Sequence, residues 1–420
     1  MSLKIIIVGN YGGVNYGDET ILSSLLRCLE LLGIKRKDVT VFSWNPLYTT
    51  KRHRTNALYY SHPFNRYFYK INFSLLLSAL RRCNLIIIGG GGLLEDINPQ
   101  ALIHYLFPLL LGKLFGKRVV LFSVGVGPLK TKIGREIVRR ACNIADAIYT
   151  RDRKSFLLLR NIGFNSAIAT TVDAATAIAC TDKIQMYAIL RKEGISPKQY
   201  NIGVALGEIP WNRALEKNIC TSLMHVLTDV IQKINKNIKI FFFCRSRNPR
   251  IISRMLPSLK NMGVPYKIIY ASLRDPREVA CIVSGMSFLI PLPLHFAIAA
   301  AMNDVPCVAL SYDDKVKTFC EKYRLPYISL DVTDPSELER ELFRLLTGIP
   351  MHRKRWRFIK DNVDKNRSIL MADLHKCLSD DRNSKLTLAS LIGVLMLMAT
   401  YSLVSLVRIL RRIQYQRSML

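Results

Sequence analysis

The chain begins MSLKIIIVGNYGGVNYGDETIL (residues 1–22), in which a β-branched run is followed by a glycine-rich loop and an amphipathic pattern. The run Ile5–Val8 predicts a buried strand, and Gly12 and Gly13 belong to the loop after it. Asp18 is the expected N-cap of the helix that follows. Such a loop and helix start present backbone N–H groups and a positive dipole end to an approaching anion. The opening stretch therefore predicts an α/β protein that handles phosphate or another anion.

Two common phosphate-binding motifs are excluded. A dinucleotide fingerprint needs G-x-G-x-x-G and an acidic residue after the second strand, but no Asp or Glu occurs between Asp38 and Glu95. A P-loop needs Gly-Lys-Ser/Thr after the glycines, and none follows. The loop instead offers Asn15, Asp18 and Glu19, polar groups that a purely structural turn does not need. Helix capping is their alternative role.

Composition indicates a folded, strongly basic protein of 420 residues with a formal net charge of +30. This length allows two domains and an appendage. The charge favours anionic partners, although a generally basic proteome would give the same excess. The ten cysteines form no C-x-x-C pair and no Cys/His cluster with zinc-ligand spacing, so neither a metal nor a cofactor is expected. We expect reduced thiols in apolar surroundings, Cys281 among them, as in a cytosolic catalytic part.

The C-terminal segment predicts a membrane anchor. Residues 386–407 form a 22-residue run without a charge, which at about 1.5 Å per residue crosses a hydrocarbon core of about 30 Å. The alternative is a buried helix, but such a helix normally keeps a polar stripe. Because Met1 leads directly into a predicted strand, no signal peptide is expected. We therefore predict a single-pass tail anchor with the catalytic domains in the cytoplasm.

A second segment, Tyr59–Lys70, interleaves aromatic and basic side chains within a stretch that has no acidic residue. Aromatic rings and basic groups suit the headgroup layer of an anionic membrane surface. The same composition could bind single-stranded nucleic acid by stacking. We prefer the membrane because of the C-terminal run, and we expect no nucleic-acid partner.

Strand-like apolar runs alternate with helical patterns along the chain, as is typical of parallel α/β sheets. The pattern resets between residues 180 and 200. We predict an N-terminal α/β domain at 1–185, a second α/β domain at 195–350, a basic helical connector at 351–385 and the transmembrane helix at 386–407. Ligands of such sheets bind beyond the carboxyl ends of the strands, here in a cleft between the two domains.

Two further glycine-rich loops are predicted at strand ends. Gly89–Gly92 follows the apolar run Leu85–Ile88, and Gly127 follows the next one. Consecutive glycines cost backbone entropy unless the chain needs unusual angles or a close approach. A tight turn is the structural alternative. We expect Gly12, Gly91 and Gly127 to line one site with His295.

An ordered set of motifs is similar to the polysaccharide pyruvyl transferase family. The motifs are GNYGGVNYGDE (9–19), GGGGLLED (89–96), GPL (127–129), YTRDRKS (149–155), LHFAIAAA (294–301) and SYDDKV (311–316), and they span roughly residues 4–325. The resemblance implies two Rossmann-like domains of the glycosyltransferase-B type, with the acceptor on the N-terminal domain and the donor on the C-terminal one.

The resemblance also implies transfer of an enolpyruvyl unit from phosphoenolpyruvate to a sugar of a glycan precursor, or to a lipid-linked sugar, as a ketal. That chemistry needs an acid, a base and cations. His295 is the implied acid or phosphate contact, and Asp18 and Glu19 could serve as base or sugar ligands. The other expected substrate-binding residues are Gly12, Gly13, Asn15, Gly90, Gly91, Gly92, Asp96, Gly127, Arg151, Asp152, Tyr312 and Lys315.

Two cations of the family pattern are missing. The family usually carries Arg two places before the histidine and another Arg after the first strand of the second domain, where this chain has Pro293 and Gly207. Because those arginines would hold phosphoenolpyruvate, the candidates to replace them are Arg213, Arg245 and Arg247. Two alternatives remain open: a nucleotide-sugar-dependent glycosyltransferase of this architecture, and a non-catalytic membrane-bound glycan or lipid binder.

Overall fold

The computed structural model describes residues 2–63, 65, 67–164, 168–178, 180, 182–207, 213–233, 237–244, 250–330, 335–348, 353–380 and 387–417. The chain divides into two compact units. One contains Met1–Gly13, Ser24–Ala174 and Ser368–Leu420, and the other contains Val14–Ser23 and Ala175–Arg367. A short stretch near the N-terminus thus belongs with the second unit, and the end of the chain belongs with the first.

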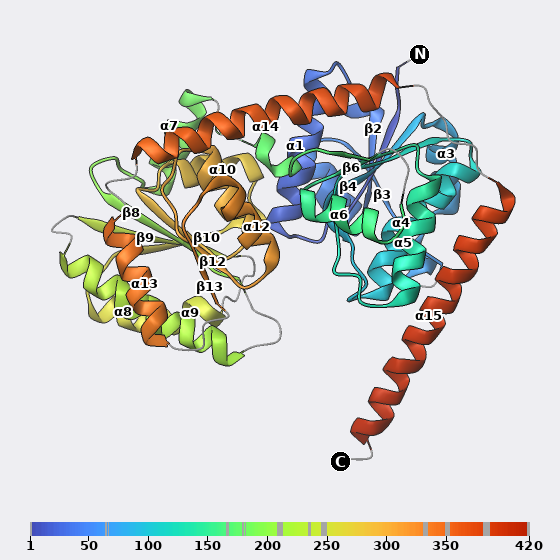
Figure 1. The fold of residues 1–420 in the computed structure, drawn as a ribbon. Coiled ribbons are helices and arrows are strands. Elements are labelled where there is room, and N and C mark those ends of the chain that lie inside the picture. Colours follow the sequence, from blue (N-terminus) through green and yellow to red (C-terminus); the bar gives the residue numbers. More distant parts are fainter. Residues whose placement is uncertain are drawn as a thin grey trace. The chain divides into compact units, whose positions relative to one another are not determined.

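Within the described residues, the first unit contains a seven-stranded parallel sheet in the order β3-β2-β1-β4-β5-β6-β7 (Figure 1). Its strands are β1 (Ile5–Val8), β2 (Val39–Ser43), β3 (Asn56–Tyr59), β4 (Leu85–Leu94), β5 (Arg118–Val126), β6 (Ala147–Thr150) and β7 (Ile168–Thr170). In the middle of the sheet, Val8 is in register with Phe42 on one side and with Ile88 on the other. The central strands are almost continuously apolar because parallel sheets are covered on both faces.

The helices of the first unit begin at side chains that suit a helix start. Asn45, Asn72, Asn98, Thr131 and Asp152 each accept a hydrogen bond from a backbone N–H of the following first turn. The helices are α1 (Tyr16–Leu31, shared between the units), α2 (Pro46–His53), α3 (Phe73–Arg82), α4 (Pro99–Leu114), α5 (Lys132–Ile144), α6 (Arg153–Asn161) and α15 (Leu388–Arg417), with short 3-10 turns η1 (Arg36–Asp38) and η2 (Phe68–Lys70).

The C-terminal helix α15 corrects the prediction of a membrane-spanning segment at 386–407. Among the residues that the structure describes, no helix combines the length and the apolarity needed to cross a bilayer. Instead, Leu391, Val394, Met398 and Tyr401 form a stripe at helical spacing that is buried in the core of the first unit. This stripe packs against α4 and α5, and Figure 1 shows α15 running beside them. The core-facing stripe was hidden because the residues around it are also uncharged.

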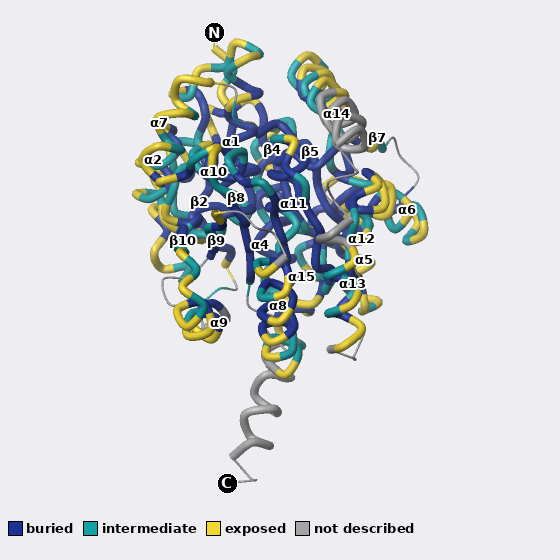
Figure 2. The backbone as a smooth tube through the Cα atoms, turned by 90° about the vertical axis from the view of Figure 1, so that its left-hand side faces the viewer, coloured by how far each residue is buried: buried dark blue, intermediate teal, exposed yellow. Residues whose placement is uncertain are grey.

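The second unit contains, in its described part, a four-stranded parallel sheet in the order β10-β9-β8-β11 and a parallel pair β12-β13. Strands β8 and β9 are almost entirely buried, whereas β10 is mostly half-buried, as the colours in Figure 2 indicate. The strands are β8 (Tyr200–Ala205), β9 (Ile238–Cys244), β10 (Tyr266–Tyr270), β11 (Phe288–Pro291), β12 (Ala309–Ser311) and β13 (Tyr327–Ser329). The helices are α7 (Lys183–Glu193), α8 (Arg213–Lys233), α9 (Arg250–Asn261), α10 (Pro276–Ser284), α11 (Leu294–Met302), α12 (Asp314–Tyr323) and α13 (Pro335–Gly348), with turns η3 (Ala174–Ala177) and η4 (Ala271–Leu273); α14 (Arg353–Ser379) begins in this unit and ends in the first.

A disulfide joins Cys180 to Cys281 within the second unit, with 4.9 Å between the two Cα atoms. It ties the segment before α7 to α10. The expectation that Cys281 is a free thiol is therefore wrong, because its partner lies 101 positions away and no local pattern marks the pair. The other cysteines, which include Cys307 and Cys320, are free and buried in the described part of the chain.

Candidate functional site

His295 lies at the carboxyl edge of the sheet in the second unit. β8 and β11 are neighbours, with Pro291 in register with Ala205, and Leu292 N–H donates to the Ala205 carbonyl at 2.8 Å. The chain then turns into α11, of which His295 is the second residue. The N-terminus of a helix at such an edge directs its positive dipole end toward any anion bound there.

The start of α1 packs directly on this histidine. Gly17 lies against the imidazole of His295 so closely that a β-carbon at position 17 would collide with Nδ1. The residue before Gly17 and the residue after His295 also meet. The rings of Tyr16 and Phe296 stack with 4.5 Å between their centroids, and both rings are buried. Phe296 in turn contacts Phe243, with 5.3 Å between their centroids. Two of the predicted motifs are therefore in direct contact, because Gly17 of the opening motif packs against the predicted catalytic histidine.

The first turn of α1 carries two carboxylates, those of Asp18 and Glu19. The helix begins at Tyr16, so Asn15 precedes it, and the Asn15 amide donates to Oδ2 of Asp18 at 2.6 Å. The prediction that Asp18 is the N-cap is therefore wrong, because Asp18 lies inside the first turn. Glu19 is next to it and is buried. Both carboxylates therefore belong to the first turn of α1, near the positive end of its dipole.

The two positions that lack the expected arginines are adjacent in the structure. A β-carbon at Gly207 would lie 3.6 Å from Cγ of Pro293, in ordinary van der Waals contact. The two missing arginines would therefore have occupied one region, at the ends of β8 and β11 and beside α11, which carries His295. Of the proposed replacements, Arg245 and Arg247 lie outside the described residues, and so does the side chain of Arg213.

Tyr312 and Lys315 follow β12. Asp313 accepts hydrogen bonds from the backbone N–H groups of Lys315 and Val316 and so begins α12. Tyr312 is half-buried against the core of the second unit, and Lys315 is exposed. Lys315 thus places a cation near the N-terminus of a helix, where an anion is already favoured by the backbone.

In the first unit, the predicted loop Gly89–Gly92 is part of β4, which corrects the prediction of a strand that ends at Ile88. A β-carbon at Gly89 would collide with the carbonyl of Phe122 on β5. The Tyr11 hydroxyl donates to the Gly89 carbonyl at 2.6 Å, and the Tyr11 ring is fully buried. Gly90 and Gly91 have φ of +79° and +91°, where a side chain would be strained. Close packing therefore accounts for Gly89, and the backbone conformation accounts for Gly90 and Gly91. A substrate contact by Gly90, Gly91 or Gly92 stays a prediction.

Gly12 and Gly13 follow β1, and Gly127 follows β5. Gly12 has φ +78°, and a β-carbon there would lie 2.7 Å from the backbone nitrogen of Asn45. Gly13 is exposed and has room for a β-carbon. Gly127 has φ +94°, and its N–H donates to the Leu94 carbonyl at 2.7 Å. Gly12 and Gly127 thus shape the loops at the carboxyl edge of this sheet through their backbone.

Asp96 holds a turn rather than facing outward. Its carboxylate accepts from the backbone N–H of Lys130 at 2.6 Å, from the N–H of Thr131 at 2.6 Å and from the Thr131 hydroxyl at 2.7 Å. The carbonyl of Asp96 also accepts from the hydroxyl of Tyr401 on α15 at 3.4 Å. These contacts assign Asp96 a structural role at the start of α5.

Arg151 and Asp152 form a buried ion-pair network at the end of β6. The Arg151 guanidinium lies 3.2 Å from Asp152 and 3.6 Å from Asp173, and it covers the backbone of Gly125. Burial alone would raise the pKa of Asp152, but the Arg151 charge and the hydrogen bond from Ser155 outweigh it, so that this pKa is lowered. Asp152 therefore stays ionised and caps α6.

Sequence reasoning missed a histidine–aromatic cluster at the carboxyl ends of β2 and β3. The Trp44 ring stacks on His104 of α4 with 4.3 Å between centroids, and Tyr60 lies 5.1 Å away from the same imidazole. Burial, and then the nearby His62, lower the pKa of His104 to about 3, so its ring is neutral at physiological pH. The backbone N–H of Trp44 donates to the Tyr11 carbonyl at 3.0 Å, which links the cluster to the loop after β1. Trp44 directly after an apolar run was the available signal.

Two α/β units with parallel sheets and functional candidates at the carboxyl edges define the class of glycosyltransferase-B-like proteins. Solved structures with this fold include HepE from Anabaena in complex with UDP and glucose, at 10% identity and a TM-score of 0.57 over 90% of this chain and 99% of that chain. They also include the MnaA–UDP complex from S. aureus, at 12% identity and a TM-score of 0.62 over 92% and 100% of the two chains. A glycosyltransferase from Rickettsia africae matches at 11% identity and a TM-score of 0.60 over 91% and 100%.

At these identities the likeness concerns the fold alone. The family itself is shown by sequence: the polysaccharide pyruvyl transferase family matches residues 15–314. The chain belongs to the polysaccharide pyruvyl transferase family, as its motifs predict, and it is a transferase. No curated protein matches its sequence.

Proposed function

We propose that this protein transfers the enolpyruvyl unit of phosphoenolpyruvate to two hydroxyls of a sugar in a glycan precursor or lipid-linked sugar. The products are a pyruvate ketal and inorganic phosphate. The observation that carries the proposal is the contact of Gly17 with His295, which places an imidazole beside a helix start bearing Asp18 and Glu19. One unit thereby supplies an acid, two candidate bases and two helix N-termini.

The roles follow from the chemistry. His295, when protonated, donates its proton to the methylene carbon of the donor, and the adjacent carbon becomes electrophilic. Asp18 or Glu19 accepts the proton of the attacking sugar hydroxyl. Phosphate leaves and takes up the proton that the carboxylate had accepted. The second hydroxyl then adds to the same carbon to complete the ketal, and its proton returns to His295. The N-termini of α11 and α12, with the exposed Lys315, stabilise the negative charge of the donor.

Donor binding requires cations to replace those absent at Gly207 and Pro293. We propose Arg213, Arg245 or Arg247 for this role, because each follows β8 or β9 in the sequence. A guanidinium offers a carboxylate or phosphate two parallel hydrogen bonds. Each alanine variant should weaken phosphoenolpyruvate binding. Normal binding by all three variants would reject the proposal that these arginines replace the missing ones.

A nucleotide-sugar donor is the second candidate. It is favoured by the neutral pair Gly207 and Pro293, and solved proteins of this fold bind UDP. A third candidate is a non-catalytic, membrane-bound glycan or lipid binder. Calorimetric titration with phosphoenolpyruvate and with UDP-glucose separates the first two, and turnover separates both from the third.

The deciding experiment measures phosphate release from phosphoenolpyruvate in the presence of mixed sugar acceptors. Replacing His295 by Ala should lower turnover about a hundredfold or more, because a positioned acid contributes that much. The melting temperature should hardly change, since His295 is only half-buried. Equal losses of stability and activity would make the histidine structural, and absence of phosphate release by the wild type would reject phosphoenolpyruvate as the donor.

A further inference from the structure

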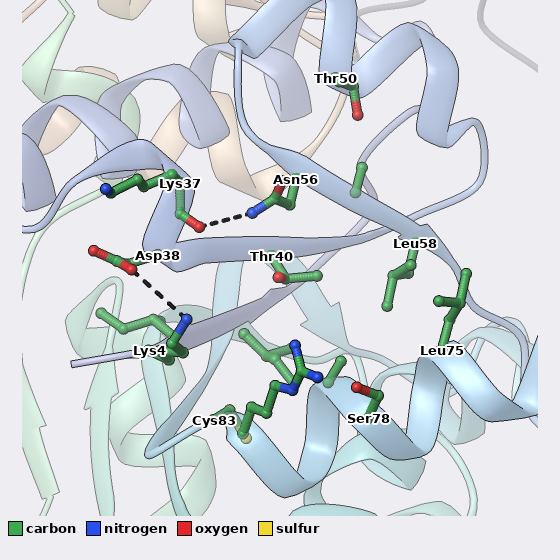
Figure 3. Close-up of a pocket in the computed structure, with 15 residues that line it drawn as sticks. Lys4, Lys37, Asp38, Thr40, Thr50, Asn56, Leu58, Leu75, Ser78 and Cys83 are labelled. Carbon is green, nitrogen blue, oxygen red and sulfur yellow. Dashed lines mark hydrogen bonds and ion pairs between the residues drawn. The ribbon is translucent and has the colours of Figure 1, made fainter. Parts of the chain in front are cut away.

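A cavity of about 450 Å³ lies in the first unit between α3 and the strands β1, β2 and β3 (Figure 3). Lys4, directly before β1, and Asn56, the first residue of β3, line it, so the cavity lies toward the amino ends of these strands. The glycine loops of the same unit follow the carboxyl ends. The proposed transfer reaction therefore gives this cavity no role, although its volume is that of a ligand site.

One face of α3 forms a wall of the cavity. Leu75, Ala79 and Arg82 line it, and their spacing places them on one side of the helix. An adjacent face, about 100° further round the helix, carries Leu76 and Leu80, which are buried in the core of the first unit. The helix is thus fixed by one face and presents an amphipathic second face to the cavity.

The cavity has a charged end and an apolar end. Figure 3 shows Lys4, Lys37 and Asp38 at one end and Leu58 and Leu75 at the other. Lys4 Nζ lies 3.9 Å from Asp38, so this carboxylate offsets one cation and the lining stays positive through Lys37 and Arg82. A molecule that matches both ends has an anionic head and a hydrocarbon tail.

Beyond the cavity wall, α3 also exposes apolar side chains, and the helix contains no acidic residue. Phe73 is 49% exposed and Leu75 is 51% exposed, and Leu77 is exposed as well. On the preceding turn, Lys70 Nζ lies 4.9 Å from the centroid of the Tyr67 ring. Surfaces that insert into the interface of an anionic bilayer typically expose aromatic and aliphatic side chains next to cations.

We propose that this cavity binds the anionic headgroup and the upper acyl chain of a membrane lipid, with the exposed side chains of α3 resting in the same bilayer surface. Charge complementarity selects an anionic head, and the leucines give the acyl chain an apolar wall. A free phosphate would leave the apolar end unused. The proposal is independent of which donor the transferase uses.

The test is co-sedimentation of the full chain with vesicles. Phosphatidylcholine vesicles that contain phosphatidylglycerol should bind the protein, and pure phosphatidylcholine vesicles should bind it far less. The double variant Lys37→Ala/Arg82→Ala should have a partition coefficient for the anionic vesicles that is at least about tenfold lower. The reason is that each cation near an anionic surface increases membrane affinity several-fold. Leu75→Asp should also reduce binding. These side chains are exposed, so the variants should fold, which thermal melting checks.

The matched control removes two exposed cations from α7 of the second unit, as Arg191→Ala/Lys192→Ala. It should bind vesicles like the wild type. An equal loss in both double variants would overturn the proposal in favour of a general charge effect. Binding to pure phosphatidylcholine at the same level would overturn it, and so would full release by inorganic phosphate or by a single-stranded oligonucleotide at matched ionic strength.

Discussion

Gly17 lies against the imidazole of His295, with no room for a β-carbon between them. Because the ring packs on the helix backbone, the start of α1 determines where Nδ1 can lie. A residue in the opening motif thus controls the position of a histidine on a different helix, without contributing a functional group of its own.

Gly17→Ala should lower turnover by about ten- to a hundredfold, because it displaces His295 and a shift of about 1 Å can cost that much. The same substitution in a His295→Ala background should have almost no further effect. The measurement is a double-mutant cycle on the phosphate-release rate. Additive losses would show that Gly17 does not act through His295.

Gly207→Arg should raise the affinity for phosphoenolpyruvate about tenfold, because a charge-assisted hydrogen bond contributes about 1.5–3 kcal/mol. Position 207 has room for a side chain, and its neighbour Pro293 brings no competing charge. Calorimetric titration checks the gain, with Ser258→Arg on the exposed surface of α9 as the control. A tighter complex with UDP-glucose alone would favour the nucleotide-sugar donor.

Met398→Ala should lower the free energy of unfolding by about 2–5 kcal/mol, because a buried methionine is lost from the core. Met396→Ala on the same helix should change it by less than about 0.5 kcal/mol. The two side chains are 0% and 66% exposed. Denaturant unfolding compares them, and equal effects would contradict the packing of α15 against the first unit.

Glu193→Gln should destabilise the second unit at neutral pH by about 1–3 kcal/mol, because it removes the buried carboxylate that pairs with Lys267 and leaves Arg274 with Glu278 alone. Burial raises the pKa of Glu193, but the hydrogen bonds and charges of Arg274 and Lys267 outweigh it and lower this pKa.

A carboxylate with a lowered folded-state pKa stabilises above its unfolded pKa of about 4.3, and the stabilisation is lost as the pH falls through the folded value. The difference between wild type and variant should therefore shrink in acid. A difference that stays constant down to pH values below about 4 would contradict the pairing.

The regular elements were largely predictable, because local patterns determine them. The strand Ile5–Val8 and a helix after the first glycine-rich loop occur as predicted. Prediction failed where distant contacts decide the structure. Glycines rarely occur inside strands, so Gly89–Gly92 suggested a loop, but all four lie in β4, where the approach of Phe122 from β5 requires Gly89.

The candidate site was predictable in its residues more than in its arrangement. The motifs named His295 and Asp18, but only packing brings Gly17 to the imidazole and Gly207 beside Pro293. Asp96 shows that a motif residue can also have a structural role, because its carboxylate accepts hydrogen bonds from the backbone N–H groups of Lys130 and Thr131.

The assignment of Val14–Ser23 to the second unit limits how this protein can be divided by genetic engineering. A fragment that starts at Ala175 would lack Tyr16, and the ring of Phe296 would lose its stacking partner. A chimaera that exchanges only the C-terminal half would pair one parent's Gly17 with the other parent's histidine. Functional exchange between relatives therefore requires the transfer of two separate segments, the ten residues of Val14–Ser23 and the distant part of the chain that they complete.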